Sequence, residues 1–352
     1  VDINTSTLTL DATLMTTAAG TVTVTNSGVA DLNAKITAAG TVRFDDATTG
    51  SISLGADIET TDVGSEIIVD AVPIIVVAEV TMTTEDGGIT LDEVLDDGAV
   101  SDRKLILIAG AGSVLVDDNI GVNGGNELDE LDIRTAGNVH FIGAAATIDV
   151  NTLNIGSVTP VGNAVVFEAA VNVAGDVDVN TNIMTINAPV TTTAGGTVTV
   201  TNSGVADVNA TITAAGTVQF DDATTGSIEL GANVETILNG AEVIVDEVVI
   251  IVTTDVSITT NDGDITLDEI LDDAAVSDRT LTLVAGTGVV VVDDNVGVNG
   301  GIVLAALDVQ SAGDVEFTAA ATIDAGSLSF GSVTPIVRDV EFSAAVNVSG
   351  PV

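Results

Sequence analysis

Pairs of neighbouring acidic side chains are the residues whose type and spacing could do chemistry in this sequence. Each pair follows an apolar stretch in which every second residue is hydrophobic, and each recurs 176 positions later. Calcium in proteins takes about six to eight oxygen ligands from carboxylates, amides and carbonyls, often on turns. The sequence therefore predicts a set of candidate Ca²⁺ ligands: Asp45, Asp46, Asp117, Asp118 and Asn119, with their copies Asp221, Asp222, Asp293, Asp294 and Asn295.

The alternative for each pair is a set of solvated carboxylates on a loop. A further pair, Asp96-Asp97, recurs as Asp272-Asp273 in the same way. No spacing matches an EF-hand loop, and no glycine-rich nonapeptide repeat is present. Calcium is thus the one cofactor that the sequence suggests, and no pair by itself specifies it.

Carboxylate pairs also carry out acid and base catalysis in glycoside hydrolases. Such sites combine acids with basic or aromatic groups, yet the single histidine, His140, is replaced by Glu316 in the second copy. Arg103 persists as Arg279 and follows an aspartate in both copies, which indicates a local ion pair at a corner. We therefore expect no enzyme, and a polysaccharide-active enzyme is the least favoured alternative.

The net charge excludes several classes of partner. The chain has 52 acidic residues against seven Lys and Arg, a formal charge of −45. Such a chain is repelled by nucleic acid and by anionic membranes, whereas divalent cations are attracted to it. No apolar span is long enough to predict membrane insertion. The chain lacks Cys, Trp and Tyr, so disulfides are excluded and a glycan groove built on flat rings is disfavoured.

The chain consists of two consecutive copies of one sequence unit. The 37 residues from Gly20 to Ala56 recur as Gly196 to Ala232 with only four differences: Leu32/Val208, Lys35/Thr211, Arg43/Gln219 and Ser53/Glu229. Tandem copying is typical of stacked architectures, in which each copy contacts mainly its neighbours. We expect two repeat units, residues 1–176 and 177–352, cut from a longer repetitive protein.

Alternation of period two predicts short strands throughout each unit. Seven inward-facing pairs begin at spacings of 20, 25, 22, 25, 25, 26 and 33 residues, which sum to 176: Val22/Val24, Val42/Phe44, Ile67/Val69, Ile89/Leu91, Val114/Val116, Val139/Phe141 and Val165/Phe167. One coil of a parallel β-solenoid needs about this length, with two or three strands per coil. The fold class is therefore all-β, a parallel β-solenoid (β-helix) with about seven to eight coils, or about 35 Å, per unit.

Two local points are less regular. Leu91–Leu95 and its copy Leu267–Leu271 have helical spacing, which predicts a helical turn at a corner. The last spacing, 33 residues, covers 170–196 and leaves an extra strand or a bulged loop open. Tandem immunoglobulin-like sandwiches are the competing architecture, but 176 residues is long for one such domain and the usual core Trp or Tyr is missing.

Several stretches resemble the giant repetitive surface proteins of bacteria, the filamentous-haemagglutinin-like adhesins and β-strand-repeat exoproteins. They are AGTVTVTNSGVADLNA, AGNVHFIGAAATIDVNTLNIGSV, AGDVEFTAAATIDAGSLSFGSVTP and VVFEAAVNVAGDVDVN. The resemblance implies a right-handed parallel β-helix, export to the cell surface, and a role in adhesion, matrix or a surface filament. It transfers no catalytic residues.

The expected function is structural: a segment of a long extracellular protein that forms a filament, stalk or sheath. Its expected partners are further copies, end to end or laterally, with no nucleic acid and no membrane insertion. The alternative is an adhesin or binding module that recognises a surface or glycan ligand through one face. Differences between the copies that cluster on one face would favour the binding module, whereas scattered differences would favour a passive structural role.

Overall fold

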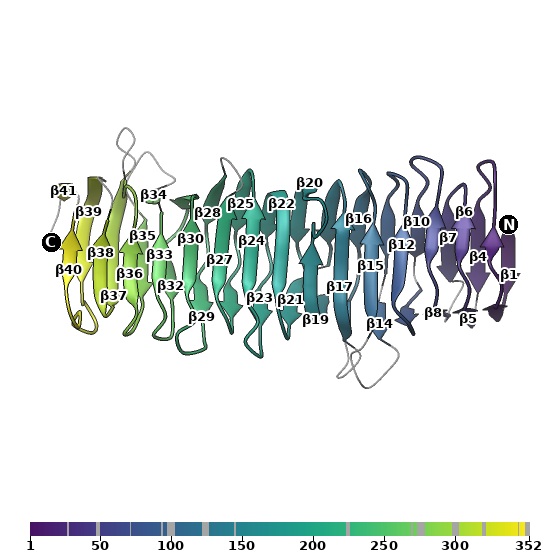
Figure 1. Ribbon diagram of the computed structural model, residues 1–352, viewed down its shortest axis with the longest axis horizontal. Coiled ribbons are helices and arrows are strands. Elements are labelled where there is room, and N and C mark those ends of the chain that lie inside the picture. The colour runs from purple at the N-terminus through teal and green to yellow at the C-terminus, as the bar shows by residue number, and fades with distance from the viewer. Residues whose placement is uncertain are drawn as a thin grey trace. The chain divides into compact units, whose positions relative to one another are not determined.

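The structure, a computed structural model, describes residues 1–26, 28–46, 50–70, 72–92, 94–96, 103–121, 127–143, 146–222, 226–268, 270–272, 279–297, 303–318, 322–343 and 345–348. Parallel strands stack as a β-solenoid of about 14 turns, with no helix in the described ranges, which confirms the predicted fold class. The chain divides into two compact units, Val1–Asn182 and Ile183–Val352. Figure 1 shows the strands of each unit stacked side by side.

Most coils run through three strands in turn, and these strands pair in parallel with the strands one coil later. In the coils that contain Ile120 and Val296, isolated bridges take the place of the second strand. We call the three stacks the first, second and third faces, in chain order. The first face of the first unit holds β1 (Asp2–Thr5), β4 (Val22–Asn26), β7 (Val42–Asp46), β10 (Ile67–Asp70), β13 (Ile89–Leu91), β16 (Ser113–Val116), β18 (Asn138–Phe141) and β20 (Val161–Phe167). The second face holds β2 (Leu8–Leu10), β5 (Val29–Leu32), β8 (Ser51–Leu54), β11 (Ile74–Val76), β14 (Val94–Asp96) and β21 (Ala170–Val173). The third face holds β3 (Leu14–Met15), β6 (Ile36–Ala38), β9 (Ile58–Thr60), β12 (Val80–Thr83), β15 (Lys104–Ile108) and β17 (Leu128–Thr135).

The second unit repeats this plan. Its first face holds β24 (Val198–Asn202), β27 (Val218–Asp222), β30 (Val243–Asp246), β33 (Ile265–Leu267), β36 (Val289–Val292), β38 (Asp314–Phe317) and β40 (Val340–Phe342). Its second face holds β25 (Val205–Val208), β28 (Ser227–Leu230), β31 (Val249–Val252), β34 (Ile270–Asp272) and β41 (Ala345–Val348). Its third face holds β23 (Val190–Thr192), β26 (Ile212–Ala214), β29 (Val234–Thr236), β32 (Val256–Thr259), β35 (Thr280–Val284) and β37 (Leu304–Ser311).

Three longer strands turn a corner without a loop. β19 (Thr147–Ile155) pairs with β21 through its first residues and with β17 through its last, and β39 (Thr322–Phe330) has the same arrangement. β22 (Val177–Ile186) pairs with β19 at its start and with β25 at its end. The long spacing over 170–196 is therefore filled by strands, and the bulged-loop alternative is wrong.

The core lies inside the coils and consists of the alternating residues. All seven inward-facing pairs are buried, with side chains at most 1% exposed. Phe141 and Phe167 stack with ring centroids 5.3 Å apart, and Phe317 and Phe342 repeat the contact at 5.2 Å. Strand alternation fills the interior in this way because inward residues of successive coils come to lie directly over one another.

The predicted helical turn at 91–95 and 267–271 is wrong. Leu91 ends β13 and Val94 begins β14, and both side chains are fully buried. Leu267 and Ile270 hold the same positions in β33 and β34. The spacing of three arises because the chain turns a corner between two strands that both face inward, so it imitates the period of a helix.

Candidate functional site: acidic and amide side chains at the coil corners

Aspartate and asparagine side chains at the corners bind the backbone of the following coil. In each case a side-chain Oδ1 accepts a backbone N–H from a residue 24 to 28 positions later, at 2.7 to 3.1 Å. We call these contacts inter-coil clamps. They join Asp57 to Thr81, Asp86 to Ala111, Asn119 to Thr147, Asn233 to Ser257, Asp255 to Thr280, Asp262 to Thr287, Asp264 to Val289, Asn295 to Thr322 and Asp314 to Asp339.

The clamps explain why the corners need short acids and amides. At a corner the strand ladder is interrupted, so a backbone N–H there requires another acceptor. Asp and Asn supply one close to the main chain and tolerate turn conformations. Asp86, for example, has a φ of +59°, and a Cβ on Gly110 of the next coil would lie 2.4 Å from its Oδ1. Six of the nine clamps are made by aspartate, so part of the acidity at the corners is structural.

The candidate calcium group at Asp117–Asn119 lies in one of these corners, directly after β16. Asp118 Oδ1 accepts the backbone N–H of Asn119 at 2.8 Å and its Nδ2–H at 2.7 Å. Asn119 Oδ1 in turn clamps Thr147 at 2.9 Å. Asp117 is exposed.

The second copy repeats this geometry. Asp294 Oδ1 accepts both Asn295 N–H groups, at 2.8 and 2.7 Å, and Asn295 clamps Thr322. Asp293 accepts a hydrogen bond from the Thr318 hydroxyl. The structure therefore brings the neighbouring candidates together, but it uses two of their oxygens to hold protein N–H groups.

The other candidate pair differs between the copies. Asp45 lies on β7 with its Oδ2 3.7 Å from the Arg43 Nε, and the same guanidinium binds Asp70 at 2.8 Å. Gln219 replaces Arg43 beside Asp221. Asp46 and Asp222 are the last residues of β7 and β27, and their backbones pair with Asn26 and Asn202. Asp97 and Asp273 lie outside the described residues. Within the described ranges no three His, Cys, Asp or Glu side chains gather as a metal-binding group. The calcium site stays a prediction.

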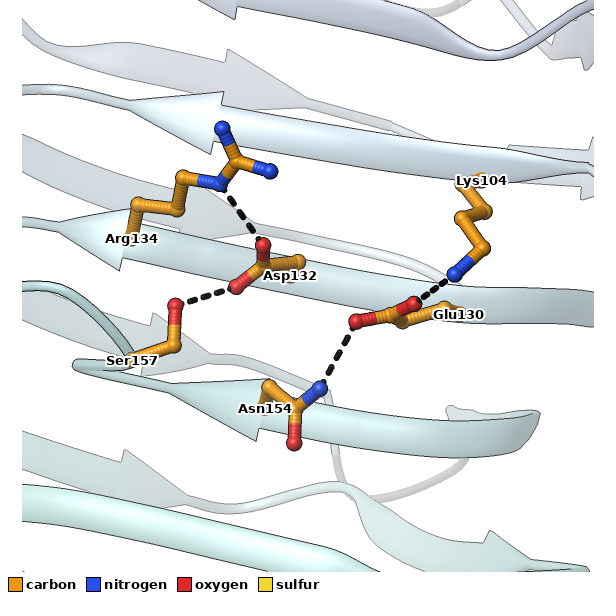
Figure 2. A network of polar contacts seen from close by, with 6 residues as sticks. All are labelled: Lys104, Glu130, Asp132, Arg134, Asn154 and Ser157. Atoms are coloured by element: carbon orange, nitrogen blue, oxygen red, sulfur yellow. Dashed lines mark hydrogen bonds and ion pairs between the residues drawn. The ribbon is translucent and has the colours of Figure 1, made fainter.

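A polar network crosses the third face of the first unit on β15, β17 and β19, as Figure 2 shows. Glu130 binds the Lys104 ammonium through one oxygen and accepts the Asn154 Nδ2–H at 2.7 Å through the other. Hydrogen bonding and charge from Glu130 raise the pKa of Lys104. The second copy has Thr280, Ala306 and Ser329 at these positions, so this part of the network belongs to the first unit.

The second unit retains part of the other half of this network. Asp132 accepts the Arg134 Nε–H at 2.8 Å and the Ser157 hydroxyl at 2.5 Å. In the second copy Asp308 holds the Ser332 hydroxyl at 2.7 Å, while Gln310 replaces the arginine. The Ser–Asp contact fixes the loop that follows β19 and β39 in both units.

Burial raises the pKa of two carboxyl groups in the first unit, Asp149 and Asp178. Asp149 on β19 is half-buried beside the corner at Gly121, and burial, together with the nearby Glu127 charge, raises its pKa. The equivalent of Glu127 is Val303, which lies beside Gly297 in the same corner of the second unit.

The remaining candidates for acid and base catalysis are His140 and the two Asp-Arg pairs. His140 lies half-buried on β18, and its Nε2 is 3.5 Å from the Glu168 carboxylate. Asp102 and Asp278, predicted to pair with Arg103 and Arg279, lie outside the described residues. The arrangement of corner carboxylates can hold backbone N–H groups and attract cations. The part of the chain that the structure describes contains no helix that could span a bilayer.

Comparison with known proteins identifies no relative. No family model, no curated protein and no solved structure matches this chain. The fold therefore defines the class, a parallel β-solenoid built from a tandem repeat, and functional conclusions depend on the geometry.

Proposed function

We propose that this chain is a structural segment of a long, repetitive extracellular protein that forms a surface filament, stalk or sheath. The observation that carries the proposal is the repetition of structure as well as sequence. Both units place equivalent strands on the same three faces. Asn119 clamps the next coil in the first unit, and Asn295 does so in the second. A second copy of such a unit adds length, whereas a second copy of an active site adds little.

The positions at which the two copies differ support a passive role. In the nearly identical 37-residue stretch, Leu32/Val208 lies in the core, Arg43/Gln219 on the first face and Ser53/Glu229 on the second face. Lys35/Thr211 is exposed at the corner before the third face. These four differences are scattered around the coil, which is the pattern expected of a spacer. Outside this stretch, one group of differences lies together on the third face: Lys104, Glu130, Arg134 and Asn154.

The experiment is electron microscopy of the native protein with and without a calcium chelator. A thin, straight fibre with an axial repeat of about 35 Å per unit is the expected result. If the fibre becomes more flexible when calcium is chelated, a bound calcium ion contributes to its stiffness. A flexible beaded string, or a compact particle indifferent to calcium, would overturn the structural proposal.

A binding module is the second candidate, because of a hollow on the third face of the second unit. It has a volume of about 600 Å³ and is lined mainly by hydroxyl and amide side chains from β32, β35 and their neighbours, including Ser257, Thr259, Thr280, Thr282 and Gln310. Such groups suit a polar ligand such as a glycan. Saturable binding to a glycan array, lost in Thr282→Val, would favour this candidate.

A further inference from the structure

One corner of the first unit exposes large apolar side chains. It consists of the loops that lead from the third face to the first, and we call it the third-to-first corner. Met15, Val63 and Val158 lie there and are 66%, 76% and 69% exposed. The three side chains belong to the coils of β3, β9 and β19, and the exposed Asp62, Glu85 and Asp86 lie on the same corner, so Val158 projects as a single apolar side chain.

Hydrogen bonds fix the loop that carries Val158. Its backbone N–H donates to the Arg134 carbonyl at 3.3 Å, and the N–H of Thr159 donates to the same carbonyl at 3.2 Å. The preceding Ser157 hydroxyl binds Asp132 at 2.5 Å. Gly156 has a φ of +74°, which turns the chain sharply out of β19. The valine therefore projects from a fixed loop as a knob.

A hollow lies beside this knob on the same corner. It has a volume of about 290 Å³, near the lower end of the range for small-ligand pockets (roughly 300 Å³). Its walls are small and uncharged: Gly110, Ala111, Thr135, Ala136, Gly137, Thr159, Pro160, Gly162 and Asn163. The hollow can admit the tip of a loop. Its walls carry no charged side chain, although the Asp86 carboxylate binds the N–H of the wall residue Ala111.

We propose that this corner is a lateral contact with a second copy of the chain, in which Val158 of each copy enters the hollow of the other. A knob beside a hole on one surface is self-complementary about a twofold axis. Repulsion between two chains of charge −45 opposes this association, and the uncharged walls of the hollow add no local charge to it. The inference rests on the proposed structural role and identifies the surface through which filaments would associate.

The second unit explains why the contact is assigned to the first. Its loop repeats the knob, with Val333 71% exposed and Ser332 held by Asp308 at 2.7 Å. However, Val337 and Arg338 stand where the first unit has Gly162 and Asn163, so a larger side chain and a charge occupy the positions of the hollow.

The contact is expected to be weak in a single chain. One loop and one hollow bury less than the roughly 1,000 Å² of a stable interface. In a protein with many repeats, the same contact made several times in parallel would raise the apparent affinity by about 10²-fold or more.

The test is sedimentation equilibrium of the full 352-residue chain at rising concentration, in about 0.5 M NaCl to screen the net charge. The expected result is a reversible dimer. Val158→Asp should weaken the dimer by about tenfold or more, because it places a charge in an apolar contact. Gly162→Val should do the same by filling the hollow, and it introduces the residue that the second unit has at this position.

Val333→Asp is the matched control, since it makes the same change in the loop of the second unit and should leave the dimer intact. Circular dichroism and thermal melting check that each variant is folded. A parent chain that stays monomeric, or a dimer equally weakened by Val333→Asp, overturns the lateral contact. Thin, straight fibres formed by Val158→Asp as well as by the parent chain, with an axial repeat of about 35 Å per unit, would show that the structural role survives without the lateral contact.

Discussion

Asn119 and Thr147 are 28 positions apart, yet the side-chain Oδ1 of Asn119 accepts the backbone N–H of Thr147 at 2.9 Å. The same bond joins Asn295 to Thr322 at 2.9 Å in the second unit. Because Ile120 and Ile148 also pair across this corner, the bond closes a gap in the ladder of the second face. Each corner clamp thus couples two successive coils at the place where strand pairing is interrupted.

The first prediction concerns this clamp. Asn119→Ala leaves the partly buried Thr147 N–H without its acceptor, and the free energy of unfolding should fall by about 1–2 kcal/mol. Amide hydrogen exchange at Thr147 should speed up strongly, while exchange at Thr322 stays unchanged. Asn295→Ala is the control and should show the reverse pattern. Unaltered exchange at Thr147 in Asn119→Ala would contradict the clamp.

Calcium binding is the second prediction. Asp118 and Asn119 each already spend one oxygen on protein N–H groups, so a calcium ion at Asp117–Asn119 would need several water ligands. We expect saturable but weak binding, with a Kd of about 0.1–1 mM by calorimetry. Asp117→Asn should weaken binding at one of the two copies and halve the stoichiometry. If NaCl of equal ionic strength raises the melting temperature as much as calcium does, the effect of calcium is charge screening and not specific binding.

The regular part of the fold could be predicted from the sequence because it depends on local alternation. Val22 and Val24 face inward by the geometry of a strand, whatever the coil above them does. The corners could not be predicted in this way. The bond from Asp57 to Thr81 depends on the length of the intervening coil, and Leu91 to Val94 imitates a helix because the chain turns between two buried strands.

A signal for the clamps is nevertheless present in the sequence. Asp86 precedes Ala111 by 25 positions and Asp262 precedes Thr287 by the same number, which is one coil length. A search for Asp or Asn one coil before a turn would have identified such residues. The candidates at Asp117–Asn119 lie at a corner, where Asn119 holds the next coil, a role that the sequence alone did not indicate.

The third prediction concerns the network specific to the first unit. The Lys104 and Glu130 side chains are 40% and 19% exposed, so solvent weakens their interaction. A double-mutant cycle with Lys104→Thr and Glu130→Ala, the residues of the second copy, should give a coupling of at most about 1 kcal/mol that decreases at high salt. The pKa of Lys104 is raised, so this contribution is present below the ordinary lysine pKa and is lost as the pH rises through the raised value. Coupling that is indifferent to salt would contradict an ion pair.

Packing in the second unit gives the fourth prediction. A void of about 10 Å³, lined only by apolar side chains, lies beside Phe220, Val234 and Val243. The first unit has Ile58 and Ile67 at these two valine positions. Val234→Ile should therefore stabilise the protein by about 0.5–1 kcal/mol, measured as a higher urea midpoint. Ile58→Val is the matched control and should destabilise by about 0.5–1.5 kcal/mol. A loss of stability in Val234→Ile would show that the void cannot accept a methyl group.

The fifth prediction is a pH dependence at Asp149. Burial and the charge of Glu127 raise its pKa above the ordinary value of 3.8, so the folded state holds this proton more tightly than the unfolded state does. At neutral pH ionisation therefore costs stability, and the cost disappears as the pH falls through the raised pKa towards 3.8. Asp149→Asn should melt at a higher temperature than the parent at pH 7, and the difference should vanish near pH 4. Asp324→Asn, where Val303 replaces Glu127, should show a smaller gain at pH 7. Equal gains in the two variants would exclude Glu127 as a cause, and a gain at Asp149 that persists at pH 4 would show that the effect is not one of ionisation.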